Sequence, residues 1–250
     1  MTLALGALEG ERLRVDALES FVTLERFDAW LATPGRWLGA FDFPFGLPRE
    51  FVEAQGLGAT CAEVIAAVHA RCPTRMAWRA MIDAWGNTRP AGARLLHRRT
   101  DQAGDVTSTS PLQTRYVPVG LMYYEGVARL VGAGVTMPGL HAGDGGRIAL
   151  EGYPRRLAHA LIERRSYKNQ DLPDRMATRE VMVSALEAGP VSAGTALRLD
   201  TALRRSLIAD ASGDRLDAVL CLVQAAHASR RDDFGLPADI DPVEGWIVGA

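Results

Sequence analysis

The sequence has few cysteines, almost no net charge and no long apolar run. Its three cysteines, Cys61, Cys72 and Cys221, are widely spaced and form no CxxC pair, so neither a disulfide framework nor a zinc ribbon is indicated, and a reducing cytoplasm fits best. The net charge of -2 gives no overall basic field, which argues against a polybasic nucleic-acid binder but does not exclude a local basic groove. No apolar run approaches the ~18 residues that span a bilayer, so no membrane partner is expected.

Motifs that would define several function classes are also missing. The first residues, MTLALGALEGERL, have neither a basic segment nor a long apolar segment, so no signal peptide is predicted. There is no GxSxG elbow, no P-loop, no internal repeat and no heptad array. The chain has 250 residues, 48% of them hydrophobic, which is enough for one large domain or for a domain with an inserted subdomain. We expect a cytoplasmic globular protein, whose oligomeric state the sequence leaves open.

The beginning of the chain predicts the order strand, strand, helix, strand. Two apolar-leaning runs, Thr2–Leu8 and Arg12–Leu18, are separated by a Glu-Gly-Glu turn, which indicates a hairpin. Apolar residues at helical spacing predict a short amphipathic helix over Leu24–Leu31. The aromatic and aliphatic run Trp37–Phe43 then predicts a buried strand.

The remainder is predicted to be mostly helical. Apolar residues at helical spacing predict helices over Pro48–Ala54, Cys61–Arg71, Thr74–Trp85, Val119–Val131, Arg155–Arg165, Arg175–Ala188, Thr195–Asp210 and Asp214–Ser229. A polar loop region is expected between Gly86 and Tyr116, where this periodicity is lost. Short strands are expected at Gly134–Pro138 and Arg147–Leu150, and a short edge strand at Gly245–Val248. The expected class is therefore α/β, with residues 48–132 as a mostly helical insertion into a single domain.

Asp42 is the first candidate for chemistry. It ends the apolar part of WLGAFDFPFGLP, Trp37–Pro48, and the proline- and glycine-rich turn follows at once. Open α/β sheets place their ligands at the carboxyl ends of their strands, which is where this acid is expected. Aspartate also commonly caps a turn or the following helix, so position alone leaves both interpretations open.

Three further carboxylates lie where apolar structure meets a break. Glu151 follows the run RIAL, and Asp214 and Asp217 lie three residues apart, hence on one face, at the start of an apolar helix. The position of Asp214 is also explained by the helix dipole, which favours an acid at the N-terminus of a helix. Asp217 lies on a helix that is apolar nearly all round, and a buried carboxylate needs a partner. Mg²⁺ or Mn²⁺ would supply one, and two such ions about 4 Å apart would clamp a phosphodiester.

Four segments, in the order FDFPFGLP, EGYP, GDRLDAVLCLVQAA and DPVEGWIVG, together resemble the domain-of-unknown-function family 429 over nearly the whole chain. The resemblance implies a ribonuclease H-like fold, that is, a mixed sheet carrying a hairpin with helices on both faces. It also implies an acidic metal site with Mg²⁺ or Mn²⁺ as cofactor. In that site Asp42 is the acid on the fourth strand, Asp214 and Asp217 are the acids of the last helix, and Glu151 is the acid of the family's Glu-x-x-Pro motif. Glu151 is expected to act there as a further ligand or as a base. The implied activity is metal-assisted hydrolysis of a phosphodiester by a two-metal-type mechanism.

The chain departs from that family at its beginning. The family's first strand is central in the sheet and carries the first catalytic aspartate, whereas Met1–Leu8 already matches the second strand. Asp16 is a poor substitute, because it falls in the third-strand region near the edge of the sheet. Either the start of the chain is placed too far downstream, or the protein has lost a ligand and part of its sheet; we favour a missing N-terminal segment.

A nuclease also needs cations for the phosphates of its substrate. Arg99 in the polar loop, Arg155 just after EGYP and Lys168 beyond the next helix are the candidates, and solvated helix faces are the alternative explanation. The leading hypothesis is a metal-dependent nuclease with nucleic acid as partner. One alternative is a non-catalytic nucleic-acid-binding protein that lacks the first-strand aspartate. Another is a phosphotransferase acting on a small nucleotide, against which the absence of a glycine-rich phosphate-binding hairpin counts.

Overall fold

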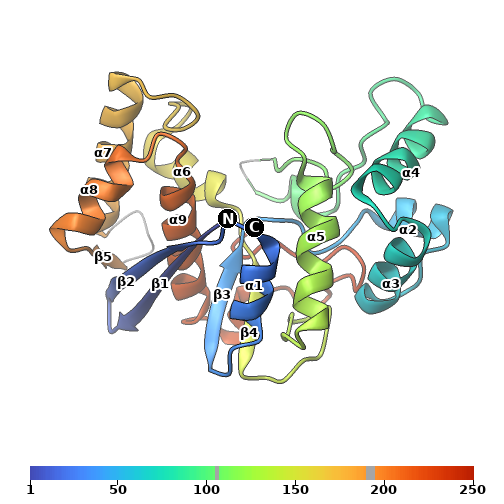
Figure 1. The fold of residues 1–250 in the computed structure, drawn as a ribbon, viewed down its shortest axis with the longest axis horizontal. Helices are drawn as coiled ribbons and strands as arrows, with labels where there is room; N and C mark the ends of the chain where they lie inside the picture. Colours follow the sequence, from blue (N-terminus) through green and yellow to red (C-terminus); the bar gives the residue numbers. More distant parts are fainter. Residues whose placement is uncertain (105–106, 190–194) are drawn as a thin grey trace. The chain divides into compact units, whose positions relative to one another are not determined.

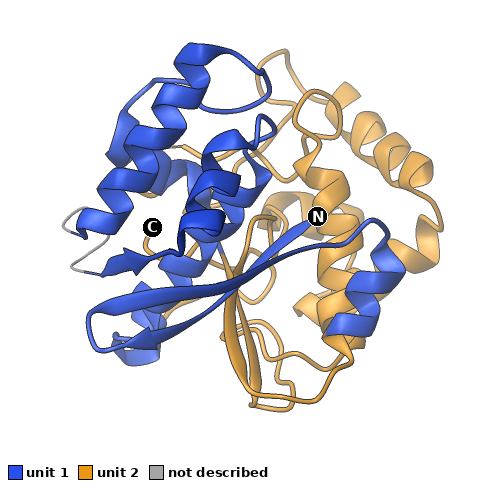
Figure 2. Ribbon diagram, turned by 60° about the vertical axis from the view of Figure 1, so that its left-hand side comes forward, with its two compact units in different colours: residues 1–30, 152–235 blue, residues 31–151, 236–250 orange. Residues whose placement is uncertain are grey.

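The computed structural model describes residues 1–104, 107–189 and 195–250. It confirms the expected α/β class, with about 45% of the residues in helices and 14% in strands. None of the helices within the three described ranges combines the length and the apolar character needed to cross a bilayer. The chain divides into two compact units (Figures 1 and 2), each described by itself below. The expectation of a single domain with a helical insertion stays a prediction.

Unit 1, Met1–Trp30 and Gly152–Gly235, contains the predicted hairpin. Strand β1 (Thr2–Glu9) pairs antiparallel with β2 (Arg12–Ser20). A third, short strand, β5 (Ala196–Arg198), lies parallel to β2, so the described sheet has the order β1-β2-β5 and is mixed.

Helix α9 covers the hairpin of unit 1 with apolar side chains. Helix α9 packs against β1 and β2, and its residues Leu216, Val219, Leu220 and Val223 lie in the core of the unit. That burial accounts for the nearly all-round apolar character of its sequence. The described α-helices are α1 (Leu24–Leu31), α6 (Pro154–Ile162), α7 (Pro173–Ala188), α8 (Thr201–Ala209) and α9 (Asp214–Ala228), followed by the 3-10 turn η3 (Asp232–Gly235).

The predicted helix over Thr195–Asp210 is wrong in its first part. Residues 196–198 form β5 instead, and α8 begins only at Thr201. The start is set by Asp200, whose side chain accepts a hydrogen bond from the N–H of Leu203 at 2.7 Å, as an N-cap residue does. The strand ahead of it is held by pairing with β2, which is distant in sequence and leaves no local pattern.

Unit 2, Leu31–Glu151 and Leu236–Ala250, contains two parallel strands. Strand β3 (Trp37–Phe41) pairs with β4 (Arg147–Glu151), so that Phe41 is the register partner of Glu151. The two other segments predicted as strands contribute only single parallel bridges to β4, from Thr136 to Ile148 and from Ile247 to Glu151.

The helices of unit 2 lie close to their predicted positions, because each has strong local signals. Helix α3 begins with a complete capping box formed by Thr60 and Glu63, and Thr74 caps α4. Buried Trp78 of α4 donates its indole N–H to the carbonyl of Gly120 at 2.9 Å, which joins α4 to α5. The helices are α2 (Arg49–Gln55), α3 (Cys61–Arg71), α4 (Arg75–Asn87) and α5 (Val119–Gly132), as Figure 1 shows.

The predicted polar loop between Gly86 and Tyr116 contains one short regular element in its described part, the 3-10 turn η1 (Thr100–Gln102). Asp105 and Val106 of this loop lie outside the described residues. Several of its polar side chains are nevertheless buried. Polar side chains are rarely buried without partners, so this region must contain a hydrogen-bonded network.

Candidate functional site

Asp42 lies in a tight turn at the carboxyl end of β3. The N–H of Phe43 donates to the carbonyl of Phe41 at 2.9 Å, so Asp42 is the central residue of a three-residue turn. Residues 43–48 are all buried, whereas Asp42 is exposed. The following helix, α2, has Pro48 at its N-cap position and no side-chain cap. Asp42 therefore does not cap that helix.

An aromatic cluster supports this turn from inside. The ring of Phe43 lies 5.8 Å from that of Phe41 and 5.5 Å from that of Phe45, measured between centroids. Helix α5 approaches the same ring at Gly126, where an added Cβ would lie only 2.5 Å from an atom of Phe43. Glycine at this position allows the helix and the turn to pack closely. The residues that follow Asp42 are thus closely packed against α5 and against neighbouring aromatic rings.

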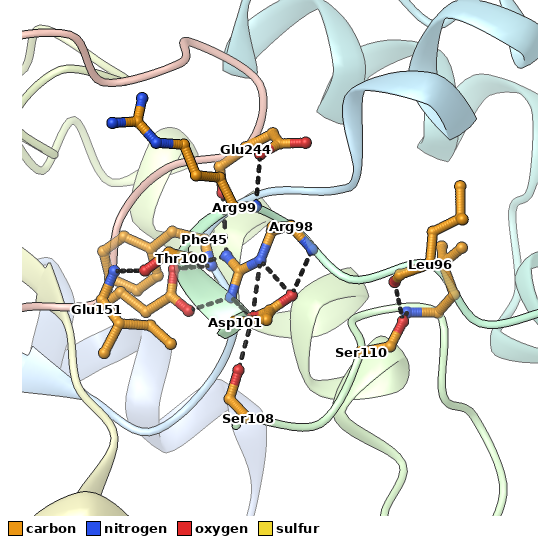
Figure 3. A network of polar contacts seen from close by, with 12 residues as sticks. Phe45, Leu96, Arg98, Arg99, Thr100, Asp101, Ser108, Ser110, Glu151 and Glu244 are labelled. Atoms are coloured by element: carbon orange, nitrogen blue, oxygen red, sulfur yellow. Dashed lines mark hydrogen bonds and ion pairs between the residues drawn. The ribbon is translucent and has the colours of Figure 1, made fainter. Parts of the chain in front are cut away.

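Glu151, at the end of β4, is buried and bound on both of its carboxylate oxygens (Figure 3). Arg98 donates from Nη2 to Oε1 at 2.6 Å and from Nη1 to Oε2 at 2.8 Å. The backbone N–H of Phe45 donates to Oε2 at 2.9 Å, which ties Glu151 to the segment after Asp42. Burial raises the pKa of Glu151 above its ordinary value, and the charge of Arg98 acts against that rise.

Arg98 is the centre of the network in Figure 3. Besides Glu151 it binds Asp101, at 2.7 Å from Nη2, and the carbonyl of Glu244 at 3.0 Å. Ser108 donates to Asp101 at 2.6 Å. Burial alone lowers the pKa of Arg98, but the two carboxylates outweigh burial and raise it above the ordinary value. The guanidinium therefore stays charged inside the unit, where unpaired charge would be costly.

Residues 239–247 are bound to the same network by hydrogen bonds and an ion pair. The backbone N–H of Arg99 donates to Glu244 at 3.0 Å, and that of Ile247 donates to the hydroxyl of Thr100 at 2.8 Å. The side chain of Arg99 pairs with Asp239 at 2.7 Å and lies over the ring of Trp246 at 5.3 Å. Arg99, predicted to bind substrate, is thus also placed to hold this segment.

Asp217 lies in the first turn of α9 in unit 1 and is 8% exposed. Lys168 donates to its Oδ2 at 2.7 Å, and the hydroxyl of Tyr167 donates to its Oδ1. The ammonium of Lys168 also lies 5.6 Å from the centre of the Tyr167 ring. The partner that a buried carboxylate requires is therefore supplied by side chains of the chain itself. Asp214, one turn earlier, is exposed.

Gly213 explains how Lys168 reaches this position. It is the N-cap residue of α9 with a φ of 79°, in the left-handed region that glycine favours. An added Cβ there would lie 2.5 Å from the Cβ of Lys168. The glycine of GDRLDA thus starts the helix and makes room for the lysine beside it.

Arg179 is a fully buried cation that the sequence did not single out. It donates from Nη1 to the carbonyl of Tyr167 at 2.8 Å and from Nε to the carbonyl of Ile208 at 2.6 Å. It therefore fixes the backbone that carries the partners of Asp217. Arg98 lies in the basic run His97-Arg98-Arg99, whose sequence indicates phosphate-binding cations and not a buried ion pair. The nearest available signal was the acid at position 101, three residues after Arg98.

The predicted residues divide between the two units. Asp42, Glu151 and Arg99 belong to unit 2, while Asp214, Asp217, Arg155 and Lys168 belong to unit 1.

Within unit 1, Asp217 and Lys168 are in direct contact, and Arg155 is exposed at the beginning of α6. Across the described residues there is no group of three His, Cys, Asp or Glu side chains that could hold a metal ion. Comparisons with protein-family models, with curated proteins and with solved structures found no match for this chain.

Proposed function

We propose that this protein hydrolyses phosphodiester bonds in nucleic acid with the help of Mg²⁺ or Mn²⁺. The observation that carries the proposal is the placement of Asp42, an exposed carboxylate at the centre of a three-residue turn that ends a parallel strand. Ligands of open α/β sheets bind at the carboxyl ends of their strands. The resemblance of the four ordered segments to family 429 supplies the reaction class.

The ribonuclease H-like fold is part of the same proposal. Three features support it: the antiparallel hairpin of β1 and β2, the parallel pair of β3 and β4, and the apolar helix α9 that packs against the hairpin. They occur along the chain in the order that the resemblance implies.

The proposed metal-binding acids are Asp42 in unit 2 and Asp214 and Asp217 in unit 1, each considered within its own unit. Their oxygens are of the type that Mg²⁺ prefers, and this ion commonly binds through one or two carboxylates together with waters and substrate phosphates. Asp42 and Asp214 are exposed, so water and a substrate can reach their carboxylates. Asp217 is already balanced by Lys168, so a metal at Asp217 would compete with the lysine. When bound, the metal would polarise the phosphate and activate water.

Glu151 has a different role in this proposal from the one the sequence predicts. Both of its oxygens are engaged by Arg98, and Oε2 also binds the N–H of Phe45. A carboxylate bound in this way supports the turn that carries Asp42. We therefore assign Glu151 as a positioning residue and not as a base.

Cleavage by the purified full chain tests the proposal. Fluorescent single-stranded, double-stranded and branched DNA and RNA are incubated with Mn²⁺, with Mg²⁺ or with EDTA. We expect cleavage of at least one substrate only with metal, and its loss in Asp42→Asn. Asp83→Asn is the control, because Asp83 is a half-exposed acid of the same unit, on α4, that pairs with Arg115. Cleavage that persists in Asp42→Asn would show that Asp42 is not required for the reaction.

A non-catalytic nucleic-acid-binding protein is the second candidate. It is favoured by the pairing of Asp217 with Lys168, which satisfies this carboxylate without a metal. It predicts retention of labelled DNA or RNA in EDTA and no cleavage under any metal condition. Metal-dependent cleavage in the assay above would exclude it.

A further inference from the structure

An open pocket lies between α3, α4 and α5 of unit 2, apart from the acids discussed above. Its volume is about 490 Å³, which is within the range of small-molecule sites. Figure 1 labels these three helices. The lining residues are His69, Pro73, Thr74, Arg75, Met76, Tyr124, Glu125 and Arg129.

The pocket has an excess of positive charge. Arg75 and Arg129 both pair with the single carboxylate of Glu125, Arg75 through Nε and Arg129 through Nη1 at 2.6 Å. Arg75 is 54% exposed and uses Nε for this pair, so its two terminal nitrogens are not engaged in it. A planar fork of this kind suits an oxyanion with several acceptor oxygens.

The start of α4 adds backbone donors to the same wall. The first intrahelical hydrogen bond of α4 is donated by Trp78 to the carbonyl of Thr74, and the side chain of Thr74 accepts from Ala77. The N–H groups of Arg75 and Met76 come before those bonds and belong to the unpaired first turn. Helix starts attract anions, and here the helix start reinforces two arginines.

The lining also includes a stacked pair of rings and an exposed apolar side chain. The imidazole of His69 stacks on the ring of Tyr124, with centroids 4.2 Å apart, and its Nε2 is fixed by the carbonyl of Tyr124 at 3.0 Å. Met76 is 80% exposed at the rim. A ring stacked against such a surface would be held in a defined orientation.

We propose that this pocket binds a small, ring-bearing phosphate monoester. The phosphate is held by Arg75, with support from Arg129 and the start of α4, and the ring lies against His69 and Met76. A monoester phosphate provides three acceptor oxygens and close to two negative charges, which match the fork of Arg75 and the excess charge of the pocket. The proposal does not depend on the proposed nuclease activity.

Calorimetric titration of the full chain in EDTA tests this site. The probes are adenosine 5′-monophosphate, inorganic phosphate and adenosine. We expect the monophosphate to bind saturably, phosphate to bind more weakly and adenosine not to bind. We expect Arg75→Gln to lower the affinity for the monophosphate by about tenfold or more, because a charged hydrogen-bonding partner is lost. Arg115→Gln is the matched control, since it removes another half-exposed arginine that pairs with a single acid.

Two further variants make the result decisive. Met76→Glu adds a negative charge at the rim without breaking an ion pair, and we expect it to weaken binding as Arg75→Gln does. Asp42→Asn leaves binding unchanged if the pocket is independent of the proposed nuclease site. The proposal is overturned if the monophosphate shows no saturable binding at millimolar concentrations, or if Arg75→Gln and Met76→Glu bind it as the wild type does.

Discussion

Arg98 donates to both carboxylate oxygens of Glu151, at 2.6 and 2.8 Å, and neither side chain is more than 3% exposed. Two segments far apart in sequence, the polar loop and the end of β4, are joined by this one buried pair. Breaking a buried pair by removing one partner leaves an uncompensated charge, which is far more costly than losing an exposed pair.

We therefore expect Arg98→Leu to destabilise the protein by about 3–5 kcal/mol. Arg115→Leu, which breaks the half-exposed pair with Asp83, should cost about 0.5 kcal/mol or less. Urea denaturation followed by circular dichroism measures both. Similar midpoints for the two variants would show that the buried network does not stabilise the unit.

Gly213→Ala should destabilise α9 at its start, because the added Cβ meets Lys168 at 2.5 Å and the backbone has positive φ. We expect a cost of about 2 kcal/mol or more. Gly10→Ala is the matched control, because Gly10 also has positive φ but nothing within 4 Å of an added Cβ, and its expected cost is about 1 kcal/mol. Thermal melting of both variants separates the stability lost to the steric clash from the stability lost to backbone strain. Equal losses of stability in the two variants would contradict the contact with Lys168.

Lys168→Met should leave Asp217 without its cationic partner and cost about 1–2 kcal/mol. The double variant with Asp217→Asn lacks both the ammonium and the carboxylate. Its loss of stability should therefore be smaller than the sum of the losses in the two single variants. A double-mutant cycle in urea measures the coupling. If Asp217 binds metal, Mn²⁺ should raise the melting temperature of Lys168→Met more than that of the wild type, because the competing ammonium is absent. Equal effects of Mn²⁺ would count against Asp217 as a ligand.

Arg49 donates to both carboxylate oxygens of Asp241, from Nε to Oδ2 at 2.5 Å and from Nη2 to Oδ1 at 2.7 Å. This pair predicts a loss of stability in acid. Burial alone would raise the pKa of Asp241, but hydrogen bonds from Arg49 and from the N–H groups of Val243 and Glu244 lower it below its ordinary value. A carboxyl with a lower pKa in the folded state stabilises the protein above its unfolded pKa. That contribution is lost as the pH falls through the folded pKa. The stability difference between wild type and Asp241→Asn should therefore shrink from about pH 5 downward. A constant difference over that range would contradict the pairing.

Much of the fold could be predicted because its signals are local. Helix α3 was expected over Cys61–Arg71 and is found there, since Thr60 and Glu63 cap it and its apolar residues face the core. Strand β5 has no comparable local signal, because it is paired with residues 12–14, far away in the sequence.

The candidate site likewise has features that follow from local sequence and features that depend on distant contacts. The location of Asp42 at the end of a strand follows from the adjacent apolar run and the turn residues. The engagement of Glu151 by Arg98, and of Asp217 by Lys168, depends on contacts between distant segments. A carboxylate at a break looks the same in sequence whether it faces solvent or a buried guanidinium, so position alone did not separate a ligand from a structural acid.

The sequence order of the two units has a consequence for biosynthesis. Unit 2 is interrupted by residues 152–235 and is completed by residues 236–250, whose Glu244 and Ile247 bind the backbone of residues 99 and 49 and the hydroxyl of Thr100. During translation these bonds form only after unit 1 has been synthesised, although domains generally fold as they emerge. Until then, the buried arginine and its carboxylates remain open to water on a nascent chain. Unit 2 should therefore reach its protease-resistant state last, although most of it is made before most of unit 1.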